Sequence, residues 1–196
     1  MSGSQFSFLE VEFVEQFEAA EKGERYALSD PRTAMIHARR ALESGVKWVY
    51  SHDRALPQPY DSKLNTLLNE LAFKELGGGH VFSVSKKIQL AGNKAVHEAK
   101  PPSKLDAVEV MSSLFRFCLW LAVTYARDKP DPKLTFNPHG LLDHSKADKK
   151  SLEEGQELAA KLESRAEAAE LARQKAAVLA HTVEELEAER QTLLAQ

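Results

Sequence analysis

One long apolar segment, residues 105–126, most constrains what this chain can fold into. From residue 107 onward nearly every position in it is apolar; besides Ser112, the polar residues are Glu109, Ser113, Arg116 and Thr124. Their spacing of three, four or eight places them on one narrow stripe of a helix. A segment of about 20 residues also suits a membrane span, but Glu109, Arg116 and a pair of serines lie inside it. We therefore predict the central, buried helix of a bundle, and no membrane protein.

The composition narrows the class of protein further. The 196 residues include 26 Lys+Arg and 29 Asp+Glu, and 43% are hydrophobic. That hydrophobic fraction supports a real core, while the near balance of charge argues against a basic coat for nucleic acid or membrane surfaces. The one cysteine, Cys118, lies in the apolar segment, which suits a reducing compartment. The N-terminus lacks the basic and apolar regions of a secretion signal, so we predict a cytoplasmic protein.

Four more helices are predicted before the core helix. Residues 8–21 alternate Phe and Val with Glu as an amphipathic helix does, and Gly23 is expected to end it. Asp30-Pro31 is a start signal for a helix that runs to about residue 50. In that helix Arg39 is expected to be partly buried and paired with Glu43, one turn away.

The later helices are bounded by loop residues. A leucine-rich third helix over residues 64–71 is expected to begin after Asp61 or Ser62, and the glycine triplet at 77–79 is expected to stop it as a flexible turn. A fourth helix is predicted over residues 81–91. Ser103 is the predicted cap of the core helix, which is the fifth.

The composition changes after residue 128. Residues 129–150 are broken by prolines and are predicted to be a linker between domains, with some apolar residues lying on the bundle. Residues 151–196 follow a heptad pattern, with positions 158, 165, 172, 179, 186 and 193 on one seam, which predicts a coiled-coil helix. We expect this helix to continue beyond residue 196, and self-association through it is one expected interaction.

No strong enzyme signature is present, and the best candidate for chemistry is residues 92–97 (GNKAVH). In this motif Gly92 would allow a tight bend or a close helix contact, and Asn93 and His97 would share one side of a helix. Lysines surround the motif at Lys86, Lys87, Lys94, Lys100 and Lys104. Three interpretations stay open: hydrogen bonds that shape the entry to the core helix, an anion or nucleic-acid site, and catalysis.

Two stretches carry a family resemblance. The first is residues 30–43 (DPRTAMIHARRALE), which includes Arg39, Arg40 and Glu43, and the second is the 92–97 motif. With residues 115–125, the linker and the coiled coil, they resemble an uncharacterised helical domain at the N-terminus of type I restriction enzyme R subunits. The resemblance covers about residues 8–142.

The resemblance implies a parent enzyme with nuclease and motor domains, which uses ATP and Mg²⁺ to translocate along DNA and cleave it. The phosphate loop and the nuclease carboxylate cluster for that chemistry are not in this sequence, so no cofactor is expected here. The expected partners are the methylase and specificity subunits and, through the parent, DNA. We expect a non-catalytic accessory module.

The same domain is similar to HEPN bundles, some of which are RNases that use an Arg followed, after four to six residues, by a His. No arginine precedes His97 at that spacing. Arg32 and His37 match it, but a five-residue step puts two side chains about 140° apart on a helix. Together, the helix pattern and this resemblance predict an all-α, HEPN-like bundle of about five helices over residues 1–128. Two alternative functions stay open: nucleic-acid binding through Lys86–Lys104, and RNA cleavage.

Overall fold

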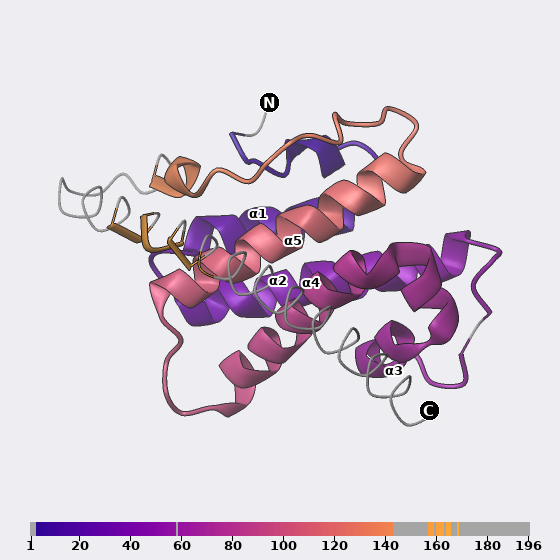
Figure 1. Cartoon of the computed structure of the whole chain (residues 1–196), viewed down its shortest axis with the longest axis horizontal. Helices are drawn as coiled ribbons and strands as arrows, with labels where there is room; N and C mark the ends of the chain where they lie inside the picture. Colours follow the sequence, from indigo (N-terminus) through magenta and orange to yellow (C-terminus); the bar gives the residue numbers. More distant parts are fainter. Residues whose placement is uncertain are drawn as a thin grey trace, which may run out of the picture. The chain divides into compact units, whose positions relative to one another are not determined.

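The computed structural model describes residues 3–57, residues 59–142 and scattered positions between 157 and 168. The chain divides into two units, Met1–Gln156 and Glu157–Gln196. The described residues of the first unit form helices and no strand: η1 (Ser7–Leu9), α1 (Val14–Tyr26), α2 (Pro31–His52), α3 (Leu64–Asn69), α4 (Leu71–His97), α5 (Lys104–Tyr125) and η2 (Pro138–Leu142). This confirms the predicted all-α bundle (Figure 1). The coiled coil predicted for 151–196 lies almost wholly outside the described residues and, like the predicted domain boundaries, stays a prediction.

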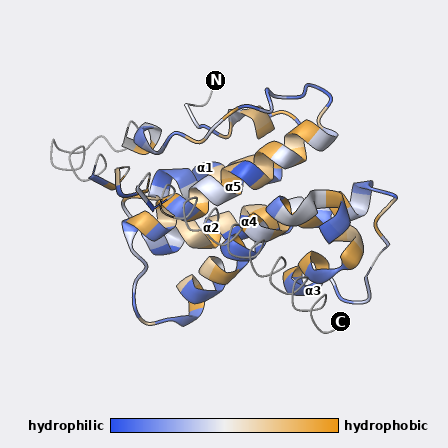
Figure 2. Ribbon diagram, viewed as in Figure 1, coloured by the Kyte–Doolittle hydropathy of each residue, from blue (hydrophilic) through white to orange (hydrophobic). Residues whose placement is uncertain are grey.

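Helix α5 is the buried centre of the bundle, as predicted. Ser103 caps it: its Oγ accepts a hydrogen bond from the Asp106 amide at 3.1 Å, and the Asp106 carboxylate accepts one from the Ser103 amide at 3.2 Å. Phe117, Cys118 and Leu121 are fully buried. Within the described residues, α5 alone is long and apolar enough to cross a membrane, but 67% of its most apolar window is buried inside the protein. Blue is confined to short stretches of α5 in Figure 2, as expected for a core helix.

Helix α2 packs against all the other α-helices of the described bundle. It begins as predicted, because the Asp30 side chain accepts a hydrogen bond from the Thr33 amide at 3.1 Å and Pro31 occupies the first turn. It runs to His52, and Ala38, Leu42, Val46 and Val49 on its inner face are fully buried.

The first helix differs from the prediction. The amphipathic stretch divides into the turn η1 and the helix α1, and α1 continues through Gly23 to Tyr26. Gly23 does not end the helix because its missing side chain makes room for α5: a Cβ there would lie 3.1 Å from the Met111 Sδ. The glycine marks a packing contact that local sequence signals do not distinguish from a stop.

The glycine triplet agrees with the prediction only in part. Helix α3 already ends at Asn69, and α4 begins at Leu71 and passes through residues 77–79. Only Gly78 leaves helical geometry, with φ of 67°. This left-handed conformation suits glycine, and it produces a kink in α4. Helix α4 thus consists of two helical segments joined by a kink at Gly78, so the chain does break at the triplet as predicted. The helix that ends there begins at Leu71, however, and is not the leucine-rich helix α3.

The N-terminal segment lies beside the segment that follows α5 (Figure 1). The Gln5 side chain donates to the Asn137 carbonyl at 3.0 Å and accepts from the Asn137 amide at 2.7 Å. The ring centroids of Phe6 and Phe136 lie 5.6 and 5.8 Å from that of Phe115. These contacts hold part of the proline-rich segment on the bundle.

Candidate functional site: a groove along α2

The structure has a groove of about 690 Å³ over the outward face of α2. Its floor is one stripe of α2 that runs from Ile36 to Ser51, and this stripe includes Arg39, Arg40, Glu43, Lys47 and Trp48. Glu15 and Gln16 of α1 form one wall, and Gly92 and Val96 of α4 form the other. Fifteen residue steps at about 1.5 Å each make the floor about 22 Å long. The groove is thus as long as four turns of helix.

Gly92 sets the distance between α4 and the floor. A Cβ on Gly92 would lie 2.5 Å from the Arg39 Cβ and 2.7 Å from its Cδ. Because such contacts are too short for real atoms, only glycine lets the two helices approach this closely at their crossing. The 92–97 motif belongs to the last turns of α4. Of the two roles expected for Gly92, the structure shows the close helix contact and not the bend.

The predicted pairing of Arg39 with Glu43 is wrong. The Glu43 carboxylate accepts instead from Lys47, one turn further along, at 2.7 Å. The Arg39 side chain is half-buried along Gly92, and its Nε is buried with no hydrogen-bond partner in the described residues. The close contact with α4 therefore holds the hydrocarbon part of Arg39 in place, and the charged end stays available.

The groove carries positive charge that the described residues do not neutralise. Arg40 is exposed and has no hydrogen bond or ion pair within the described part of the chain. Since Lys47 and Glu43 neutralise each other, Arg39 and Arg40 face Glu15 as the remaining carboxylate of the lining. Two guanidinium groups against one carboxylate favour an acidic ligand.

Asn93 and His97 do not make the hydrogen bonds proposed for them. Asn93 is half-buried and His97 is exposed, and neither side chain has a hydrogen-bond partner in the described residues. The connection into α5 is held by Arg32 of α2. The Arg32 Nη1 donates to the Ala95 carbonyl at 2.7 Å, and its Nη2 donates to the Glu98 carbonyl at 2.9 Å. Arg32 thus satisfies carbonyls at the C-terminal end of α4.

Arg32 and His37, which match the RNase spacing in the sequence, contact different helices. Arg32 reaches the end of α4, whereas the His37 ring stacks on Tyr26 of α1 with centroids 6.2 Å apart. The two side chains are therefore not brought to one site in this structure.

His37 gives the free energy of unfolding a pH dependence. Burial lowers the pKa of His37, and the nearby positive charges of Lys22 and Arg40 lower it further. A histidine with a lowered folded pKa binds its proton more readily in the unfolded chain. Its contribution to stability is therefore complete above the unfolded pKa of about 6.5 and is lost as the pH falls through the folded pKa.

We expect His37→Gln to flatten the decrease in stability below about pH 6.5. Urea unfolding of both proteins at several pH values between about 7.5 and 5 measures this difference. Because Gln does not titrate, the free energies of unfolding of the two proteins should change in parallel above about pH 6.5. Below that pH the free energy of the unchanged chain should fall more steeply. Parallel curves for the two proteins over the whole range would contradict the assignment.

The five lysines do not form one continuous basic surface. Lys86 donates to the side chains of Asn65 and Gln89 at 2.9 and 2.6 Å, and Lys87 pairs with Glu109 at 2.9 Å.

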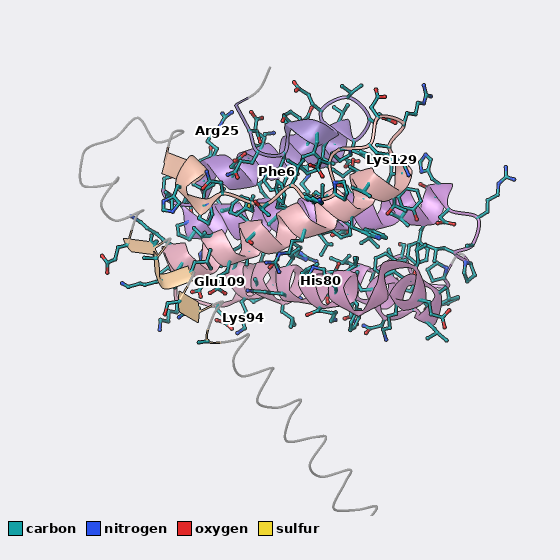
Figure 3. All side chains as sticks on the ribbon, turned by 45° about the horizontal axis from the view of Figure 1, so that its top comes forward. Phe6, Arg25, His80, Lys94, Glu109 and Lys129 are labelled. Atoms are coloured by element: carbon teal, nitrogen blue, oxygen red, sulfur yellow. The ribbon has the colours of Figure 1, made fainter. Side chains whose placement is uncertain are left out.

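A second groove, of about 590 Å³, is lined by Lys87, Lys94 and Lys100. It also contains the carboxylates of Glu98, Asp106 and Glu109. Lys94 and Glu109 lie near each other in Figure 3. The carboxylates in this second groove offset its lysines. Lys104, in the first turn of α5, does not line it.

The comparisons with known proteins give a family. A family model described as a domain of unknown function, DUF4145, matches residues 21–134. The chain belongs to the DUF4145 family. Searches of curated proteins and of solved structures found no match.

The DUF4145 match includes most of the groove. It spans the whole floor and the α4 wall, and leaves out Glu15 and Gln16 of the α1 wall. Sequence interpretation had singled out Arg39, Arg40, Glu43 and Gly92 but missed Trp48 and Lys47. Their spacing with Arg40 and Ser44 does follow one helix face. However, that spacing does not indicate which face the other helices leave open. Among the described residues no group of three or more His, Cys, Asp or Glu is arranged to hold a metal ion.

Proposed function

We propose that this DUF4145 domain is a non-catalytic accessory module that binds a partner protein through the groove along α2, and that it serves a type I restriction enzyme R subunit. One observation carries the proposal: the groove presents Arg39 and Arg40 without carboxylate partners of their own. The two sequence runs that resemble the R-subunit domain meet here, because Arg39 belongs to the first and Gly92 to the second.

The groove has the chemistry of a protein-binding surface. Arg and Trp are the residues most enriched among those that dominate binding energy at protein interfaces. Trp48 lies in the groove with the two arginines, and the exposed apolar side chains of Ile36 and Val96 add contact area. A partner that buries these apolar groups would also strengthen the charge pairs by excluding water.

The proposed partners are the methylase and specificity subunits. In this proposal the parent enzyme translocates along DNA and cleaves it with ATP and Mg²⁺, and those ligands bind other domains. The domain described here would hold the motor near the subunits that recognise the DNA sequence.

The test measures binding of the full chain to the purified methylase–specificity complex encoded with it. Replacing both Arg39 and Arg40 by Met removes the two charges but keeps the hydrocarbon contact with Gly92. We expect this double variant to bind at least about tenfold more weakly, as removal of central interface residues commonly does. The matched control is Lys129→Met with Lys133→Met, since both lysines are exposed and outside the groove.

The control should bind like the unchanged chain. Neither Lys129 nor Lys133 is among the residues that line the groove, so their replacement removes two positive charges without changing its lining. If the unchanged chain does not associate with the complex, the proposed function is wrong. If the double variant binds as tightly as the control, the groove is not the binding surface.

The two other functions have less support from the contacts. For nucleic-acid binding, Lys86 and Lys87 already have protein partners and three carboxylates share the groove of Lys94 and Lys100. Salt-sensitive DNA binding that is lost on charge reversal of Lys86, Lys87 and Lys94 would revive it. For RNA cleavage, Arg32 and His37 would have to meet at one site, and they contact different helices.

A further inference from the structure

We infer that the element bound in the groove is an α-helix of about four turns, laid along α2, with carboxylates over Arg39 and Arg40 and apolar side chains over Trp48. This inference rests on the proposed function, because it assumes a protein partner. It adds the secondary structure and the charge pattern of what binds.

The surface of the groove selects a helix over an extended peptide. Its floor and both walls are faces of helices, whose backbone groups are already paired within each helix. A bound strand would find no edge to complete and would leave its own backbone groups without protein partners. A helix satisfies its backbone internally and packs its side chains between those of its neighbours. The length of about 22 Å corresponds to about 15 residues of helix.

The arrangement of charge along the floor sets the pattern on the bound helix. Arg39 and Arg40 lie toward the start of the stripe, and Trp48 lies eight residues beyond Arg40, about 12 Å away. The Trp48 ring is fixed by stacking on His52 with centroids 4.0 Å apart and by an edge contact with Phe13 at 4.9 Å. We therefore expect two carboxylates one turn apart, and a large apolar residue about two turns from them.

A second copy of this chain fits the groove poorly. A two-fold axis through the middle of the floor, between residues 43 and 44, would place two copies of α2 side by side in opposite directions. Residue i would then face residue 87 − i, so Arg40 would face Lys47 of the other copy. Glu43 would also lie near its own copy. Like charges at these places disfavour the pair, and a different protein is the better occupant.

The experiment uses labelled 18-residue synthetic peptides and the full chain, with fluorescence anisotropy as the readout. The test peptide is an alanine-based helix with two Glu four residues apart and a Leu two turns further on. One control peptide has Gln in place of both Glu, and a second has Pro at its centre, which breaks the helix. A DNA duplex of similar length is a third probe.

We expect saturable, micromolar binding of the test peptide. Binding should weaken at least about tenfold with either control peptide and with the Arg39→Met, Arg40→Met protein. The Lys129→Met, Lys133→Met protein should bind like the unchanged chain. Circular dichroism melts of each variant check that the fold is retained.

Three results would overturn the inference. Equal affinity for the helical and the proline-broken peptide would mean that the groove does not select a helix. Preferential binding of the DNA duplex that depends on Arg39 and Arg40 would assign the groove to nucleic acid. No binding of any peptide would reject the charge pattern, while association with the methylase–specificity complex would still support the proposed function.

Discussion

Gly92→Ala is expected to lower the free energy of unfolding by about 2 kcal/mol, which for a bundle of this size lowers Tm by about 8 °C. The added methyl group would lie 2.5 Å from the Arg39 Cβ. That atom is fixed to the backbone of α2, so the side chain cannot rotate away and the two helices must separate. Overpacking commonly costs about 1 to 3 kcal/mol, and a clash with an atom fixed to the backbone belongs at the upper end of that range. About 1 kcal/mol is recovered because alanine favours the helix more than glycine, which leaves a net loss of about 2 kcal/mol.

Gly79→Ala is the matched control for this substitution. It lies in the same helix, α4, and a Cβ there meets no atom within 4 Å. Without a clash the gain in helix propensity should dominate, so this variant is expected to unfold at the same or a higher temperature. Thermal and urea unfolding of the two variants measure the difference. Equal stability of the two alanine variants would show that the helix crossing is not tight at Gly92.

Arg32→Met is expected to cost about 2 kcal/mol, because a hydrogen bond to a charged group contributes about 1.5 to 3 kcal/mol. The guanidinium of Arg32 donates to the Ala95 and Glu98 carbonyls, at 2.7 and 2.9 Å, and more loosely to the Ala99 carbonyl, at 3.3 Å. Its positive charge also lies at the C-terminal end of α4, where the helix dipole favours a cation. Methionine keeps much of the hydrocarbon chain but leaves these carbonyls to water.

Arg40→Met is the control, eight residues further along the same helix. Arg40 is exposed and has no bonded partner in the described part of the chain, so its replacement should change stability by less than about 0.5 kcal/mol. Hydrogen exchange of the Arg32 variant should show the loss of protection first in the last turns of α4. An unchanged exchange rate at residues 95–98 would refute the capping role of Arg32.

The parts of the fold that the sequence predicted correctly are those with local causes. The Asp30-Pro31 start of α2 and the Ser103 cap of α5 depend on atoms within three residues of one another. The core position of α5 follows from its nearly continuous apolar surface. Each of these signals is contained in one short segment, so no knowledge of the neighbouring helices is needed.

The errors come from residues whose role depends on another helix. Gly23 resembles a helix stop in the sequence, and Gly92 is equally compatible with a bend or a close contact, but each makes room for a side chain of a different helix. Arg32 bonds carbonyls more than sixty residues away, which no local pattern indicates. Arg39 and Arg40 were selected from the sequence, but their lack of carboxylate partners became visible only when Glu43 was seen to pair with Lys47.

Chemical modification of Cys118 can measure how often the core of the bundle opens. Cys118 is the one cysteine in the sequence, it is fully buried in α5, and burial raises the pKa of its thiol. A thiol reagent can modify it only in molecules whose central helix has come free of its neighbours. The rate of modification under native conditions therefore counts those rare molecules directly, without denaturant, and can rank substitutions such as Gly92→Ala by how often they let the core open.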